Sequence, residues 1–193
     1  MMVFILKKFL RCFITATASL IISQISLAAD IETLVTTCNA CHGQNSVAQN
    51  NAWPSLAGQK QGYLALQLSA FQDGSRKNPL MDNIVSSLSE QDIEDLAKYY
   101  AGLPFSKPAA TNINTAGQNV RANCISCHGM NGHTVNATWP NLAGQNQDYL
   151  YQQLVSFSNK TRDSIIMHEI AKVLSDQQMK DVAEYYQQIG VEH

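Results

Sequence analysis

The pentapeptide Cys38-Asn39-Ala40-Cys41-His42 returns 86 residues later as Cys124-Ile125-Ser126-Cys127-His128. The second half of the 193-residue chain keeps this offset without an insertion, and from Cys38 to Tyr100, 28 of 63 positions are identical to their partners. Shared composition alone would not align two halves so closely, so the chain contains a duplicated unit. Two copies are too few to stack as an open solenoid, and we expect two lobes, each with its own core.

Three further groups of residues recur at the same offset. The first is Trp53-Pro54-Ser55-Leu56-Ala57-Gly58-Gln59, which returns as Trp139-Pro140-Asn141-Leu142-Ala143-Gly144-Gln145. The second pairs Tyr63, Leu64, Gln67, Leu68 and Phe71 with Tyr149, Leu150, Gln153, Leu154 and Phe157. The third pairs Arg76, Met81, Leu88, Ser89, Tyr99 and Tyr100 with Arg162, Met167, Leu174, Ser175, Tyr185 and Tyr186.

Apolar residues within each lobe follow a helical period. Leu64, Leu68 and Phe71 stand at positions i, i+4 and i+7 and therefore share one helix face, as do their counterparts in the second lobe. Ser89 with Asp92, and Ser175 with Gln178, have the spacing of an N-terminal capping box. The helices that they open carry the apolar stripes Ile93, Leu96, Ala97 and Tyr100, and Met179, Val182, Ala183 and Tyr186. No alternating strand pattern is convincing, so the predicted fold class is all-α.

The first 28 residues have the organisation of a secretory signal peptide. Three basic residues are followed by an apolar stretch from Cys12 to Ile25, and Ser26 and Ala28 suit cleavage after Ala28, with cleavage after Ala29 left open. A retained anchor helix is the alternative, although the stretch is shorter than the ~20 residues that a membrane span needs. Export predicts a periplasmic protein and removes Cys12, so that four of the five cysteines remain.

The charge of the chain argues against a nucleic-acid partner. The chain has 13 Lys and Arg against 15 Asp and Glu. Loss of the three basic signal residues leaves 10 basic residues against the same 15 acidic ones, so the mature chain is acidic. A hydrophobic content of 45% is too high for a disordered chain. No later stretch is long enough to span a membrane, so we expect no transmembrane segment after the signal, with peripheral membrane association left open.

Prolines divide the rest of the chain. Pro104 and Pro108 oppose helix and strand, so we expect a linker over residues 104–115. The predicted lobes are then residues 29–103 and 116–193. A lobe of this size, with a long polar loop around residues 43–58, has a thin apolar core and would be marginally stable without a bound group to complete it.

Both pentapeptides match the Cys-x-x-Cys-His pattern of c-type haem attachment. Two thiols one helical turn apart reach the two vinyl groups on one porphyrin edge, so Cys38, Cys41, Cys124 and Cys127 would form the thioethers. A thioredoxin-like dithiol needs a βαβ setting that the sequence lacks, and a structural zinc site needs more ligands than each lobe repeats. Two motifs behind an export signal, with no cysteine left over, favour two haem c groups over these sites and over a plain disulfide.

The adjacent His42 and His128 would each supply one axial ligand to iron, and a second must come from elsewhere. Met81 and Met167 occupy equivalent positions, each 39 residues after its histidine, whereas the other methionines beyond the signal have no methionine partner. Ligation by Met81 and Met167 gives the His/Met scheme of cytochromes c, although methionine is more often a core filler. His168 is an alternative to Met167, and an exposed polar position is its other expected fate.

These motifs together resemble the dihaem cytochromes c4, class I cytochromes c built from two similar lobes. The resemblance covers nearly all of the chain after the signal. It implies helical lobes that each wrap one haem, related by approximate twofold symmetry and facing each other across the linker. It also implies that the carbonyls of Pro54 and Pro140 accept the N–H of the axial histidines. Arg76 and Arg162 would pair with haem propionates, with a solvated surface position as the alternative, and the paired tyrosines near the end of each lobe would lie in the core.

Six-coordinate irons leave no open position for a substrate, so we expect outer-sphere electron transfer rather than enzyme activity. The predicted carrier takes electrons from a membrane quinol-oxidising complex to a terminal oxidase or another reductase, by transient docking. The alternative is the dihaem electron-accepting subunit of a periplasmic dehydrogenase, of the flavocytochrome c sulfide dehydrogenase type. An enzyme such as a dihaem peroxidase or a thiosulfate dehydrogenase is disfavoured, because it would need a labile ligand or an additional axial cysteine.

Overall fold

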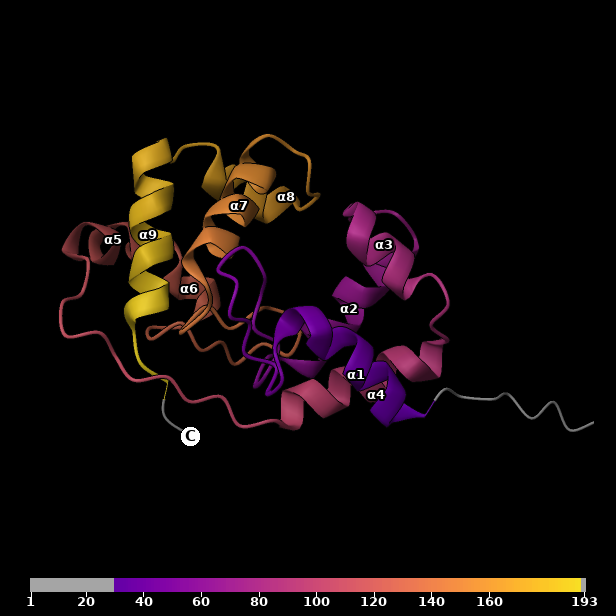
Figure 1. The fold of residues 1–193 in the computed structure, drawn as a ribbon. Coiled ribbons are helices and arrows are strands. Elements are labelled where there is room, and N and C mark those ends of the chain that lie inside the picture. Colours follow the sequence, from indigo (N-terminus) through magenta and orange to yellow (C-terminus); the bar gives the residue numbers. More distant parts are fainter. Residues whose placement is uncertain (1–29, 192–193) are drawn as a thin grey trace, which may run out of the picture.

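The computed structural model describes residues 30–191, which form two groups of helices side by side (Figure 1). The first lobe contains α1 (Ile31–His42), α2 (Gln61–Gln72), α3 (Pro79–Val85) and α4 (Glu90–Gly102). The second contains α5 (Thr115–Val120), the 3-10 turn η1 (Arg121–Asn123), α6 (Ile125–His128), α7 (Gln147–Ser158), α8 (Ile165–Ala171) and α9 (Asp176–Gln188). The predicted signal peptide lies outside the described residues.

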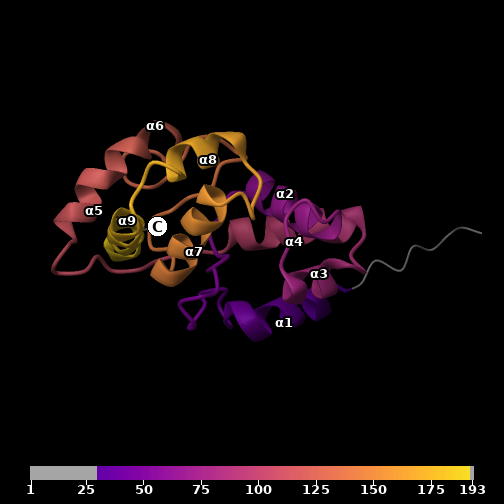
Figure 2. The same ribbon diagram turned by 90° about the horizontal axis from the view of Figure 1, so that it is seen from above.

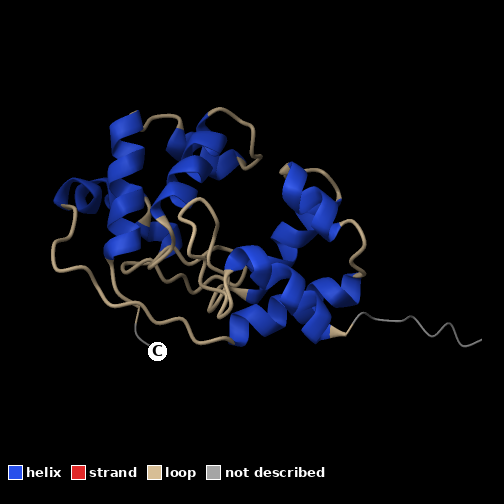
Figure 3. Ribbon diagram, in the orientation of Figure 1, coloured by secondary structure: helices blue, strands red, loops and turns tan. Residues whose placement is uncertain are grey.

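Helices and loops account for the described chain, apart from one isolated bridge between Lys107 and Val191 (Figure 3). The predictions of an all-α fold and of two tandem lobes are therefore confirmed. None of the helices within residues 30–191 is both long enough and apolar enough to cross a membrane.

Both predicted capping boxes open the last helix of a lobe. The Ser89 hydroxyl accepts the Asp92 N–H at 3.1 Å, and the Asp92 carboxylate accepts the Ser89 N–H at 2.9 Å. Ser175 and Gln178 make the same exchange at 3.2 and 2.9 Å at the start of α9. Each box satisfies two N–H groups that the first helical turn would otherwise leave without a partner.

Each lobe has a core of its own, and the predicted apolar stripes form it. In the first lobe the buried members are Val35, Leu64, Leu96, Ala97 and Tyr100. In the second they are Leu150, Val182, Ala183, Tyr185 and Tyr186. The core assignment of the paired tyrosines is wrong for Tyr99, which is 38% exposed, because the buried apolar face of α4 follows positions 93, 96, 97 and 100 and position 99 falls outside it.

A third apolar cluster lies where the lobes meet, and sequence periodicity did not indicate it. It consists of Ala57, Phe105, Ala143 and Val191. Phe105 comes from the segment between α4 and α5, and Lys107 in the same segment exchanges backbone hydrogen bonds of 3.0 and 2.8 Å with Val191. The connecting segment is therefore packed against the junction and runs extended from one lobe to the other (Figure 1).

Reciprocal contacts relate the lobes by an approximate twofold axis. The loop that follows α1 reaches the second lobe, where the Asn51 carbonyl accepts the Tyr149 N–H at 2.9 Å. The corresponding loop of the second lobe reaches back, and the Ala137 carbonyl accepts the Tyr63 N–H at 3.2 Å. Residues 51 and 137, like 63 and 149, differ by the repeat offset of 86. Viewed from above, the two sets of helices lie on either side of these loops (Figure 2).

The lobes differ most where the first helix of the repeat should run. Helix α1 is continuous over 12 residues, whereas the second lobe divides the equivalent segment into α5, η1 and α6. Gly117, Asn119 and Asn123 weaken helix formation here. Gly117 also lets α5 lie directly on α9, because a Cβ at this position would collide with the Asp181 carbonyl and lie 2.8 Å from the Tyr185 Cβ.

We predict that Gly117→Ala destabilises the protein by about 2 kcal/mol or more, because the added methyl forces α5 away from α9. Gly102→Ala is the matched control, since a Cβ at Gly102 meets nothing within 4 Å and alanine is the better helix former. Chemical denaturation of the haem-loaded protein measures both variants. Equal stabilities for the two would contradict the close contact between α5 and α9.

Candidate haem sites

Each pentapeptide ends a helix at the edge of a cavity. Cys38, Cys41 and His42 occupy the last turn of α1, and Gly43 follows with φ +89°. Gly129 follows His128 with φ +81°. At either position a Cβ would collide with a loop carbonyl, so only glycine lets the chain turn away here. The turn leaves the histidine at the helix end, where its ring lines the cavity.

Both histidine rings are oriented by a proline carbonyl. The Nδ1–H of His42 donates to Pro54 O at 2.8 Å, and that of His128 donates to Pro140 O at 2.9 Å. A carbonyl only accepts, so Nδ1 carries the proton and Nε2 is left with its lone pair. Burial lowers the pKa of both imidazoles, against the opposing effect of the carbonyl. Each ring is therefore neutral near pH 7, the form that binds iron.

The four cysteines of the described chain are free and partly buried. Burial raises the pKa of the Cys38 and Cys124 thiols, although the nearby hydroxyls of Tyr100 and Tyr186 act in the opposite direction. All four line the cavity, with the two members of each pair separated by one helical turn. No disulfide competes for them, so they remain available for thioether bonds.

Met81 and Met167 line the same cavity from α3 and α8. The helix caps hold their backbones: the side chain of Asn78 accepts the Met81 N–H at 3.2 Å, and that of Ser164 accepts the Met167 N–H at 3.3 Å. These two capping residues stand three positions before each methionine, a spacing typical of an N-cap. The N-cap spacing is present in the sequence, but helices α3 and α8 were not among the predicted elements.

His168 lies beside Met167 but is held elsewhere. Its Nδ1 is 2.9 Å from the Phe157 carbonyl, and its side chain is partly buried rather than exposed. Among the residues that line the cavity, Met167 is present and His168 is not. The geometry thus favours Met167 as the residue that faces the second histidine's site.

One continuous cavity of about 1130 Å³ reaches both sites. Its lining from the first lobe includes Cys38, Cys41, His42 and Met81, and its lining from the second lobe includes Cys124, Cys127, His128 and Met167. Apolar side chains such as Leu68, Phe71, Leu154 and Phe157 form much of the remaining wall. The volume and the apolar wall suit large apolar groups.

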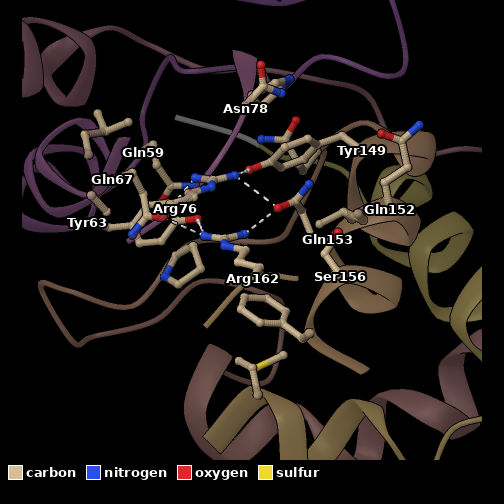
Figure 4. Close-up of a pocket in the computed structure, with 18 of the residues that line it drawn as sticks. Gln59, Tyr63, Gln67, Arg76, Asn78, Tyr149, Gln152, Gln153, Ser156 and Arg162 are labelled. Atoms are coloured by element: carbon tan, nitrogen blue, oxygen red, sulfur yellow. Dashed lines mark hydrogen bonds between the residues drawn. The ribbon is translucent and has the colours of Figure 1, made fainter. Parts of the chain in front are cut away.

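Two arginines that line this cavity join the lobes (Figure 4). They belong to a set of side chains that we call the arginine cluster: Tyr63, Gln67, Arg76, Tyr149, Gln153 and Arg162. Arg76 donates to Gln67 of its own lobe at 2.9 Å, and to Tyr149 and Gln153 of the other lobe at 3.1 and 3.0 Å. Arg162 mirrors it, donating to Gln153 at 2.7 Å, Tyr63 at 3.0 Å and Gln67 at 2.7 Å.

The cluster holds two positive charges with no carboxylate of the described chain paired to them. The ion pairs within residues 30–191 are Lys172 with Glu169 and Lys180 with Asp176. Arg162 is only 9% exposed and Arg76 is partly buried, so neither is a solvated surface arginine. Buried charges are costly unless an opposite charge compensates them. A pair of haem propionates within the cavity fits this donor set.

Three polar side chains at the junction were not assigned a role from the sequence. Gln59, Gln145 and Asn146 are each less than a tenth exposed, and all hydrogen bond to backbone of the opposite lobe. The repeat carried a signal for the glutamines, because both lobes have glutamine at this position. Periodicity could not show that the partner lies in the other lobe.

The fold and the paired sites define a cytochrome with two c-type haem sites. A cytochrome c family model matches the chain twice, over residues 28–103 and 115–190. The chain belongs to the cytochrome c family, and its two lobes place it among the dihaem cytochromes c4. The predicted family, two haem c groups and an electron-transfer function are thereby confirmed.

Three similar proteins match the chain over most of its length. A thiosulfate dehydrogenase electron acceptor of Stutzerimonas stutzeri is 32% identical over 203 residues, covering 92% of this chain and 94% of that protein. Cytochrome c4 of Pseudomonas aeruginosa is 32% identical over 165 residues, covering 78% and 82%. The crystal structure of reduced recombinant cytochrome c4 from Pseudomonas stutzeri superposes with a TM-score of 0.75 at 29% identity, covering 84% of this chain and 100% of that one.

We predict that Arg162→Met destabilises the haem-loaded protein by about 2–3 kcal/mol, because it removes three charge-assisted hydrogen bonds, two of which join the lobes. Lys172→Met is the control, since its ion pair is exposed and such pairs contribute about 0–1 kcal/mol. Denaturant unfolding compares the two variants. Similar losses of unfolding free energy in the two variants would show that the arginine cluster does not hold the lobes together.

Proposed function

We propose that Cys38 and Cys41 bind one haem covalently and Cys124 and Cys127 the other. His42 with Met81, and His128 with Met167, are the proposed axial ligand pairs. Bound haem supplies a one-electron iron couple at each site. The observation that carries the proposal is that both sets of residues, one from each lobe, line one shared cavity. Residues 29–103 and 116–193 are the proposed lobes, with residues 104–115 between them.

The protein's own groups favour transfer of electrons over chemistry at iron. The oriented rings of His42 and His128 and the thioethers of Met81 and Met167 would occupy both axial positions at each site. Methionine ligation raises the reduction potential, as electron carriers of this kind need. Two sites in one molecule, joined by the arginine cluster, give the carrier a capacity of two electrons with transfer between sites inside the chain.

We further propose that the protein works in the periplasm, accepting electrons from a membrane quinol-oxidising complex and passing them to a terminal oxidase or another reductase. Exposed apolar side chains next to the second site support transient docking. Ile165 and Ile166 are 83% and 59% exposed and directly precede Met167. Val173, 71% exposed, follows the same helix. The predicted signal peptide supports export.

A second candidate role is that of electron acceptor for a periplasmic dehydrogenase. Its support is the similarity, over 92% of the chain, to a protein described as a thiosulfate dehydrogenase electron acceptor. The docking surface would be the same, and only the electron donor differs. The dehydrogenase that this relative suggests acts on thiosulfate, whereas the sequence suggested a flavocytochrome.

We expect the exported protein to contain two haems, each with a sulfur ligand. The pyridine haemochrome assay should give two haems per chain, and the oxidised protein should show the far-red sulfur-to-iron band. Met81→Ala and Met167→Ala should each remove about half of this band. Met130→Ala, at a side chain that is 63% exposed, should leave the band intact. A full band in either of the first two variants would refute that residue as a ligand.

The two donors can be separated by rapid kinetics. We expect the oxidised protein to be reduced by quinol through a purified quinol-oxidising complex faster than by thiosulfate through a thiosulfate dehydrogenase. Replacing Ile165 and Val173, which are exposed and do not line the cavity, by serine should lower the favoured rate several-fold without changing the haem spectrum. Faster reduction by the dehydrogenase would reverse the assignment of the donor. Failure of both donors would reject both proposed roles.

A further inference from the structure

Each cavity-facing histidine is connected to a glutamine of the opposite lobe through a single peptide unit. The Pro54 carbonyl accepts the His42 Nδ1–H at 2.8 Å. The other end of the same peptide unit is the Ser55 N–H, which donates to Gln145 Oε1 at 2.9 Å. In a trans peptide the carbonyl and the N–H point in opposite directions. The histidine therefore lies on one side of the unit, and the glutamine of the other lobe lies on the other side.

The second lobe repeats this arrangement with the lobes exchanged. The Pro140 carbonyl accepts the His128 Nδ1–H at 2.9 Å. The Asn141 N–H of the same peptide unit donates to Gln59 Oε1 at 2.8 Å. Gln59 is a residue of the first lobe, and it stands 86 positions before Gln145. Both chains of hydrogen bonds thus cross the junction in opposite directions.

Each glutamine is fixed in place by its second amide atom. Gln145 Nε2 donates to the Ser55 carbonyl at 2.9 Å, and Gln59 Nε2 donates to the Asn141 carbonyl at 3.0 Å. Gln145 is 6% exposed, Gln59 8% and Ser55 5%. The hydrogen bonds between Gln145 and Ser55 are buried, and those between Gln59 and Asn141 are partly buried. Away from water, neighbouring hydrogen bonds polarise one another.

We propose that Gln145 strengthens the hydrogen bond of His42, and Gln59 that of His128, so that each lobe tunes the histidine of the other. When a glutamine oxygen accepts the peptide N–H, the carbonyl of that unit becomes a better acceptor. It draws the Nδ1 proton more strongly, which makes the ring a stronger electron donor at Nε2. The inference rests on the proposed role of His42 and His128 as axial ligands. Gln59 and Gln145 are positioning residues, because they act through the peptide.

The test exchanges each glutamine for methionine, which has a similar length and no comparable acceptor. In the reduced, haem-loaded protein, Gln145→Met should shift the NMR signal of the His42 Nδ1–H to the position expected for a weaker hydrogen bond, and the signal of the His128 Nδ1–H should not move. Gln59→Met should shift the His128 signal in the same way and leave the His42 signal unmoved. Loss of the cooperative neighbour should also favour the reduced state of the affected haem, raising its reduced-to-oxidised ratio at fixed potential by about two- to fivefold.

Asn146→Ala is the matched control for a loosened junction. Asn146 Nδ2 donates to Ala48, Asn50 and Trp53 carbonyls of the opposite lobe, at 3.2, 3.3 and 2.8 Å, but not to the 54–55 peptide unit. Loss of this side chain should weaken the junction, but it should not shift the His42 N–H signal selectively. Gln145→Glu keeps an oxygen for the Ser55 N–H. It should return the His42 signal to the wild-type position or carry it toward a stronger hydrogen bond.

Four results would overturn the proposal. Equal shifts of both histidines in each methionine variant would show general loosening of the junction, as would an Asn146→Ala effect equal to that of Gln145→Met. If both histidines are bound to iron but their N–H signals do not shift in either glutamine variant, the inference is rejected and the proposed ligand set is unaffected. Wild-type protein in which His42 or His128 is not bound to iron would reject the proposed ligand set and, with it, the inference.

Discussion

The hydrogen bond from each cavity-facing histidine to a proline carbonyl constrains the surrounding chain more than any other contact. For the ring to meet that carbonyl, the helix must end at the histidine, and Gly43 and Gly129 end it with backbone angles that other residues rarely adopt. The loop must then return past the ring to present Pro54 or Pro140 at about hydrogen-bond distance. The same loop carries the residues that meet the other lobe, so the ring orientation and the junction are built by one segment.

The junction between the lobes is held mainly by polar groups. Its apolar part is a small cluster around Phe105, whereas amide side chains such as Gln59, Gln145 and Asn146 are buried against backbone. Buried amides are costly unless their hydrogen bonds are satisfied, and here both ends of each glutamine have partners. Such bonds are directional, so they fix one relative orientation of the lobes where an apolar face would allow several.

Much of the fold could be predicted because it depends on local patterns. The helices of the two cores follow from apolar spacing, and both capping boxes follow from a serine three residues before Asp92 or Gln178. The candidate site could be predicted because the cysteines and histidines are close in sequence. Contacts between Arg76 and Tyr149, or between Gln145 and Ser55, join residues 73 and 90 positions apart. Such contacts leave no periodic pattern in the sequence, and only the identity of Arg76, Tyr149 and Gln145 with their counterparts in the other lobe marked these positions as unusual.

The reciprocal junction has the geometry of an isologous dimer, in which the same surface serves both partners. Tyr63 and Tyr149, Gln67 and Gln153, and Gln59 and Gln145 exchange places under the twofold operation. Joining two such units in one chain makes their association independent of protein concentration, because the linker sets a high effective concentration. Once the units are joined, each copy is free to diverge, as α5, η1 and α6 have done from α1. A symmetric surface thereby becomes compatible with two sites that need not be equal.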